Sequence, residues 1–328
     1  MLTRTLDITF EGFIAASTPL LIPSFSSRAA IPDEIDIEMA IDIMSEIITD
    51  VSLISAYDIY HSKERFPKIE AQNLLFIDSG GYECSVDNNL TDIGFYKPSP
   101  NNWDTQKHIE AIDALSTPVP LVLISYDHPR QRCSIDEQIR SASVLFAGRD
   151  VLKEILLKSS SNSSPIDIGQ VSQNIELLYE FDVLGVTEKE LGATVLTRMK
   201  NIAHLRLEME TRGFEIPIHI FGSLDPITTP LYYLSGADIF DGLSWLRYSF
   251  GKGELHYINS KGVVDKGVEM TQAQIWVAVC RDNYYALKEL EEKLKSVHSE
   301  QDISALDYQN GFFKSTYEKL NSELGGVL

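Results

Sequence analysis

Cysteine is scarce in this sequence, and so are the patterns that reveal a metal centre. The chain has 328 residues but only three cysteines, Cys84, Cys133 and Cys280, with no CxxC pair. The histidines show neither HxH nor HExxH spacing. Disulfide frameworks and protein zinc sites need such groupings. We therefore expect reduced thiols, no metal and no other cofactor.

Long apolar runs are also missing. No segment approaches the ~18 consecutive apolar residues of a membrane span, and the first residues, MLTRTLDITFEG, lack the apolar centre of a secretory signal. The sequence contains neither a GxGxxG nor a GxxxxGK[ST] phosphate loop. These absences predict a cytoplasmic protein without membrane contact.

Basic residues are in the minority. The 28 Lys and Arg residues face 48 Asp and Glu residues, a formal net charge of -20. Such a surface repels polyanions on average, so a nucleic acid has to meet a local basic patch or a helper protein that supplies positive charge. An acidic surface also serves solubility alone, so the charge does not decide the substrate.

Apolar runs typical of buried strands alternate with amphipathic stretches, a pattern that favours a parallel α/β protein. The candidate strands each lead into a polar or glycine-rich loop: 74–77, 120–126, 181–186, 216–221 and 237–240. The candidate helices between and after them are 135–145 with Ser134 as its N-cap, 188–212, 225–234 and 284–297.

Strand and helix in series predict a (β/α)8 barrel over residues 1–295, followed by a helical tail over 296–328. A doubly wound open sheet is the alternative, and both folds place ligands at the carboxyl ends of the strands. The serine-rich stretch 159–165 reads as a surface loop within the barrel domain.

Three of these strands lead into an aspartate: Asp127 after 120–126, and the candidate catalytic pair of Asp78 in DSGGY and Asp241 in DIFDG. Two carboxylates from different strands can divide a glycosyl transfer, one attacking the sugar carbon and the other moving the proton of the departing group. Each acid also has a simpler interpretation, as a turn-forming aspartate beside glycine.

Three segments resemble, in the same order, those of the tRNA-guanine transglycosylases and their DNA-acting relatives. They are DSGGY at 78–82, SYD at 125–127 and GADIFDG at 236–242, and with weaker similarities they cover about residues 50–290. These enzymes exchange guanine for a 7-deazaguanine in a nucleic acid. The resemblance implies a base-exchange glycosyltransferase, here on DNA or tRNA, with a free 7-deazaguanine base as second substrate.

The resemblance also implies a role for each matching residue. Asp241 would attack C1′ and form a covalent ribosyl intermediate, and Asp78 would be the general acid and base. Asp127 would accept hydrogen bonds from the base, unless it only caps a turn. The residues implied to contact base or sugar are Ser79, Gly80, Gly81, Tyr82, Gly185 and Gly222, although Tyr82 also reads as a core aromatic.

The sequence departs from the family beyond residue 242. The cysteines and histidine that hold the family's structural zinc are absent, and the basic stretch after the nucleophile reads SWLRYSFGK. Arg247 and Lys252 remain to meet phosphate, with Trp245 and Tyr248 available to stack on a base. We therefore expect a divergent, zinc-free member, in DNA modification or anti-phage defence.

Two other functions remain open at this point. Water could resolve the intermediate, which would make the protein a hydrolytic N-glycosidase. The barrel could also bind a 7-deazapurine or nucleotide without catalysis, because fold does not dictate function.

Overall fold

The computed structural model describes residues 1–29, 31–62, 72–84, 103–127, 132–161, 164–251 and 253–327. Eight parallel strands close into a barrel, in the order β10-β3-β4-β5-β6-β7-β8-β9. The strands are β3 (Leu20–Phe25), β4 (Val51–Ser55), β5 (Leu74–Asp78), β6 (Leu121–Ile124), β7 (Leu152–Leu157), β8 (Val183–Thr187), β9 (Ile218–Phe221) and β10 (Ile239–Gly242). The predicted α/β barrel is thereby confirmed, and the open sheet is excluded.

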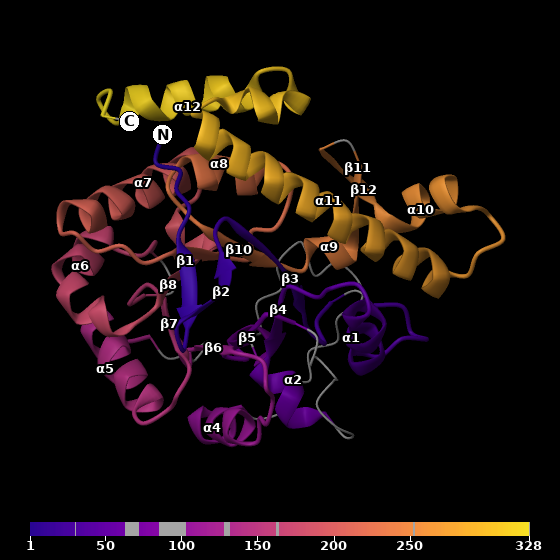
Figure 1. Ribbon diagram of the computed structural model, residues 1–328, viewed down its shortest axis with the longest axis horizontal. Coiled ribbons are helices and arrows are strands. Elements are labelled where there is room, and N and C mark those ends of the chain that lie inside the picture. The colour runs from indigo at the N-terminus through magenta and orange to yellow at the C-terminus, as the bar shows by residue number, and fades with distance from the viewer. Residues whose placement is uncertain are drawn as a thin grey trace.

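Helices follow the strands and cover the outside of the barrel (Figure 1). The longer ones are α1 (Ile37–Ser45), α2 (Ala56–His61), α4 (Thr105–Asp113), α5 (Ile135–Phe146), α6 (Ile168–Gln173), α7 (Val195–Thr211) and α8 (Thr228–Leu234). Short turns α3 (Gly81–Cys84) and α9 (Ser244–Arg247) follow β5 and β10 directly. Two further short helices, η2 (Ile175–Glu180) and η3 (Glu188–Leu191), flank β8.

Helix α5 illustrates how local sequence sets an element. Ser134 and Glu137 form a reciprocal capping box at its N-terminus, as the Ser134 prediction required. The predicted single helix over 188–212 was wrong. It divides into η3 and α7, because Gly192 adopts a φ of 142° that interrupts the helix and Thr194 then caps α7.

The chain after the barrel strands begins with a hairpin of β11 (Tyr248–Gly251) and β12 (Glu254–Tyr257), followed by α10 (Ile258–Lys266). The 29-residue helix α11 (Gln272–Glu300) then runs back across the barrel, and η4 (Ile303–Gln309) and α12 (Phe312–Glu323) end the chain (Figure 1). Trp276 of α11 donates its indole N–H to the Leu246 carbonyl at 3.0 Å, and Lys288 reaches Asp50 at 2.6 Å. Helix α11 thus packs on the barrel and crosses the expected boundary at residue 295.

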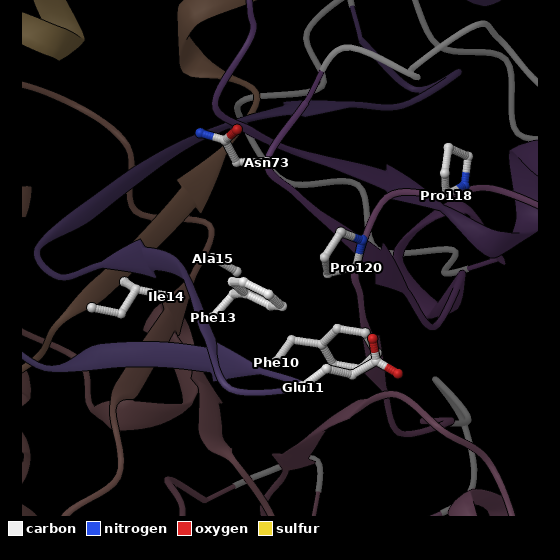
Figure 2. A pocket seen from close by; sticks show the side chains of 8 residues that line it. All are labelled: Phe10, Glu11, Phe13, Ile14, Ala15, Asn73, Pro118 and Pro120. Atoms are coloured by element: carbon white, nitrogen blue, oxygen red, sulfur yellow. The ribbon is translucent and has the colours of Figure 1, made fainter.

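An N-terminal hairpin of β1 (Asp7–Phe10) and β2 (Phe13–Ser17) lies at the amino ends of the barrel strands. Its Ile8 is buried in the same apolar cluster as Val51 and Leu74, which begin β4 and β5. A pocket of about 380 Å³ separates the hairpin from the loops before β5 and β6, with Phe10 and Phe13 on one side and Pro120 on the other (Figure 2). This pocket is at the end opposite to the predicted catalytic residues.

None of the helices in the described ranges combines the length and the apolar character that crossing a membrane requires.

Candidate active site

Asp241 lies in β10, and the two neighbouring strands, β3 and β9, position the groups that contact its carboxylate. Its Oδ2 accepts a hydrogen bond from Ser24 Oγ of β3 at 2.7 Å, and its Oδ1 accepts one from the Gly222 amide after β9 at 3.0 Å. Gly222 has a φ of 81°, a conformation that glycine adopts without strain. The sequence assigned Gly222 to the substrate, whereas the structure shows its amide bound to the predicted nucleophile. Asp241 is therefore fixed in orientation.

A buried histidine that the sequence prediction did not assign stands behind Asp241. His219 Nε2 lies 3.3 Å from Asp241 Oδ1, in ion-pair contact without hydrogen-bond alignment, and His219 Nδ1 lies 2.7 Å from Glu154 Oε1. Burial lowers the pKa of His219, but the carboxylates of Glu154 and Asp241 outweigh it and raise the pKa to about 9. This environment favours the protonated imidazolium at neutral pH.

Asp78 is the last residue of β5 and remains partly exposed. Desolvation by the surrounding protein is the first cause that raises its pKa well above the usual range, and the carboxylates of Glu83, Asp127 and Asp241 raise it further. This environment favours the protonated carboxyl. The two predicted catalytic aspartates thus interact with each other but have opposite surroundings.

Asp127 follows β6 and is bound to the DSGGY loop. Ser79 Oγ donates to Asp127 Oδ1, while Lys158 at the end of β7 places its Nζ 2.5 Å from Asp127 Oδ2. A Cβ atom at Gly81 would come within 2.5 Å of Asp127 Oδ1, so this close approach requires glycine. A base that binds Asp127 has to share it with Lys158, a partner that the sequence did not suggest.

Aromatic side chains border the same loop. The Trp103 indole N–H donates to the Ser79 carbonyl at 3.0 Å, and the Trp103 and Tyr57 rings meet edge to face at 5.4 Å. A Cβ atom at Gly80, whose φ is 80°, would lie 2.8 Å from Trp103 Nε1 and 2.8 Å from Tyr57 Cβ. Gly80 therefore lets the backbone pass close to the two rings, and sequence order gave no indication of this contact.

Two more buried acids lie beside Asp78, and both were absent from the prediction. Glu83 accepts hydrogen bonds from Ser26 and Ser55 hydroxyls, and Asp58 accepts one from the Ser27 amide at 2.8 Å. Burial is the main cause that raises the pKa of Glu83 to about 7 and of Asp58 to about 6. Mutual repulsion of the carboxylates adds to the shift of Glu83. The rim, meaning the carboxyl ends of the barrel strands around Asp78, consequently contains several carboxyl groups close together.

Tyr82 lies between two arginines. The guanidinium of Arg28 stands 4.4 Å from the ring centroid, and Arg247 Nη2 lies 3.2 Å from the Tyr82 hydroxyl. Arg247 also donates to the Arg28 carbonyl at 3.1 Å. Arg28 thus covers one face of the ring that the sequence assigned to base stacking, and Arg247 is held near the DSGGY loop.

The structure corrects the role predicted for Trp245. Its side chain is fully buried, its indole N–H donates to the Ser24 carbonyl at 3.0 Å, and it meets Phe25 edge to face at 5.3 Å. Trp245 is therefore a core residue and not a surface for stacking a base. Tyr248, which begins β11, is partly buried with its carbonyl bound by Asn283, and Lys252 lies outside the described residues.

Gly185 also has a packing role. It lies inside β8, where a Cβ atom would come 2.6 Å from the Phe221 ring and 2.7 Å from Glu154 Oε1. The absence of a side chain thus leaves space for Phe221 and for the acid that binds His219. The sequence placed Gly185 in the wall of a base pocket, but its neighbours are barrel side chains.

The structure brings Asp78, Ser79, Asp127 and Asp241 to one end of the barrel, as expected from their positions at strand ends. Within the described residues, no group of three or more His, Cys, Asp or Glu side chains is arranged to hold a metal ion. No protein-family model matches this chain, and neither does any curated protein.

Proposed function

We propose that this protein is a base-exchange glycosyltransferase that replaces guanine with a 7-deazaguanine in DNA or tRNA. The proposal rests on one observation above all: Asp78 and Asp241 share one rim but have opposed environments. Desolvation and neighbouring carboxylates favour a proton on Asp78, whereas Asp241 accepts hydrogen bonds from Ser24 and Gly222 and lies in ion-pair contact with His219. Pairs of this kind divide acid from nucleophile in enzymes.

In the first half-reaction, Asp78 gives its proton to the departing guanine as the bond between C1′ and the base nitrogen breaks. Asp241 Oδ2 attacks C1′ from the opposite face and forms an ester with the sugar. In the second half-reaction, the incoming 7-deazaguanine loses its ring proton to Asp78 and attacks C1′, and the electron pair of the ester bond returns to Asp241. Two displacements retain the configuration at C1′.

Recognition of the base falls to Asp127, which accepts hydrogen bonds from the guanine-like N–H groups, beside the backbone at Ser79 to Gly81. A base in duplex DNA has to leave the stack to reach these carboxyls. The net charge of -20 opposes a polyanion, so Arg28 and Arg247 beside Tyr82 supply local positive charge, and a helper protein supplies the rest.

The experiment that tests this function measures incorporation of labelled guanine and a labelled 7-deazaguanine into tRNA, duplex DNA and single-stranded DNA, with Asp241→Asn as the control. Incorporation into one polymer that is lost in the control supports base exchange and identifies the acceptor. Release of free base without incorporation favours the hydrolytic N-glycosidase. Base binding that persists in Asp241→Asn, with no turnover on any polymer, favours a non-catalytic binding protein.

A further inference from the structure

The barrel interior contains a line of three ionisable side chains, one from each of three strands. Glu154 comes from β7, His219 from β9 and Asp241 from β10. The side chains of Glu154 and His219 are wholly inaccessible to solvent, and Asp241 is 6% exposed. The contacts of 2.7 Å and 3.3 Å on the two sides of the imidazole make the line continuous.

Apolar and small residues maintain this line. Phe221 stacks on the His219 ring with centroids 4.0 Å apart, and Phe76 meets it edge to face at 5.9 Å. Gly185 leaves the space that Glu154 and Phe221 fill. The imidazole therefore has little freedom to rotate, and the charged groups that act on it are Glu154 and Asp241.

The two oxygens of Asp241 have different neighbours. Oδ1 faces the Gly222 amide and His219 Nε2, whereas Oδ2 accepts a hydrogen bond from the Ser24 hydroxyl. A hydroxyl can rotate away from an oxygen, but a backbone amide and a packed ring cannot. Oδ2 is thus the oxygen available for bond formation, and Oδ1 becomes the carbonyl oxygen of the resulting ester.

We propose that His219, held by Glu154, is a positioning residue that fixes Asp241 for attack through Oδ2 and stabilises the carboxylate when it leaves. This inference rests on the proposed function. No proton moves between His219 and Asp241 in either half-reaction. The positive charge stabilises the carboxylate that is regenerated when the C1′–Oδ2 bond breaks.

The test combines kinetics with a titration that needs no substrate. Glu154→Gln keeps the shape of Glu154 but removes the charge, and His219→Gln keeps a donor near Nε2 but removes the imidazolium. We expect each variant to lower the rate at which the covalent intermediate forms in a single turnover by about 10²-fold. The KM for free base should change little. A residue with a purely structural role would change stability and both constants together.

The pH profile gives the sharper result. In the wild type, transfer should decline as pH rises through about 9, because His219 then loses its charge. In Glu154→Gln this decline should move to lower pH, since burial continues to lower the His219 pKa and one of the two carboxylates that raise it is gone. An unmoved profile, or a full rate in both variants, would overturn the inference.

Titration of the ¹⁵N-labelled imidazole by NMR separates this inference from the function on which it rests. His219, identified by its missing signal in His219→Gln, should be protonated at pH 7 and should titrate at lower pH in both Glu154→Gln and Asp241→Asn. A neutral wild-type imidazole at pH 7 would overturn the proposed electrostatic role of His219. If these shifts occur but no polymer accepts a base, the electrostatic contact stands and its role in transfer is refuted.

Discussion

Two aspartates three positions apart belong to the β10 region, Asp238 just before the strand and Asp241 within it. Their surroundings differ in kind. Asp238, just before the strand, is fully buried against the equally buried guanidinium of Arg206 and accepts the Ile218 amide at 2.8 Å. Asp241, near the other end, is held by Ser24, Gly222 and His219. An aspartate is therefore structural at the start of β10, whereas the aspartate near its end is available for chemistry.

The difference extends to the two ends of the barrel. At the amino ends of the strands, Asp238 pairs with Arg206 and Asp50 pairs with Lys288, so the charges there are matched. At the carboxyl ends, desolvation first and then three other carboxylates raise the pKa of Asp78. Like charges in a desolvated rim lower stability, and such an arrangement is typical of a functional site.

Replacing Asp241 or Asp238 with asparagine should give the largest difference in base-exchange activity. Asp241→Asn should reduce base exchange at least about 10⁴-fold, because an amide does not attack C1′. Its melting temperature should change little, since the asparagine oxygen still accepts from Gly222. Asp238→Asn is the matched control and should retain the chemistry in the folded fraction. Equal activity of Asp241→Asn and wild type would refute the proposed nucleophile.

The structural role of Asp238 can be tested by measuring stability alone. Asp238→Ala leaves the buried Arg206 guanidinium without its carboxylate and should lower the free energy of unfolding by about 3–5 kcal/mol. Denaturant unfolding measures this loss. Glu210→Ala removes a more exposed partner of Arg4 and should cost less than about 1 kcal/mol. Similar losses in the two variants would contradict the structural role of Asp238.

Recognition of the base at the carboxyl ends of the barrel strands can be tested without measuring transfer. Asp127→Ala removes the acceptor for the base and should weaken binding of guanine or 7-deazaguanine about 10- to 100-fold, as expected when a charged hydrogen-bond partner is lost. Isothermal titration calorimetry measures the affinity. Asp136→Ala on the surface of α5 is the control and should bind normally. Unchanged affinity in Asp127→Ala would place the base elsewhere.

The crowded acids should also make stability depend on pH. The raised pKa values of Glu83 and Asp58, about 7 and about 6, mean that the folded state keeps protons that the unfolded state releases. The stabilisation is complete below the unfolded pKa values near 4 and is lost as pH rises through about 7.

Glu83→Gln should therefore reduce the loss of unfolding free energy between pH 5 and pH 8 by about 2 kcal/mol. Denaturation curves at the two pH values give this difference. Asp136→Ala again serves as the control, because its carboxyl is on the surface of α5 rather than in the rim. An unchanged pH dependence in Glu83→Gln would mean that this acid titrates normally.

Part of this site could be predicted from sequence because strand ends carry a local signature. An apolar run that stops at an acid and glycines located Asp78 and Asp241, and parallel strands then bring their carboxyl ends together. The aspartate of the SYD segment was found in the same way. Strands β3, β4 and β7 escaped the prediction because Pro23, Ser52 and Glu154 interrupt their apolar runs.

Local patterns in the chain are enough to predict the alternation of strands and helices, and with it a barrel whose strand-end acids lie at one end. Which polar groups meet across the barrel depends instead on how the whole chain folds. Glu154, His219 and Asp241 are separated by tens of residues, and their contacts depend on strand register and closure rather than on local pattern. Trp245 became a core residue for the same reason: a loop's exposure is set by what the rest of the chain packs against it.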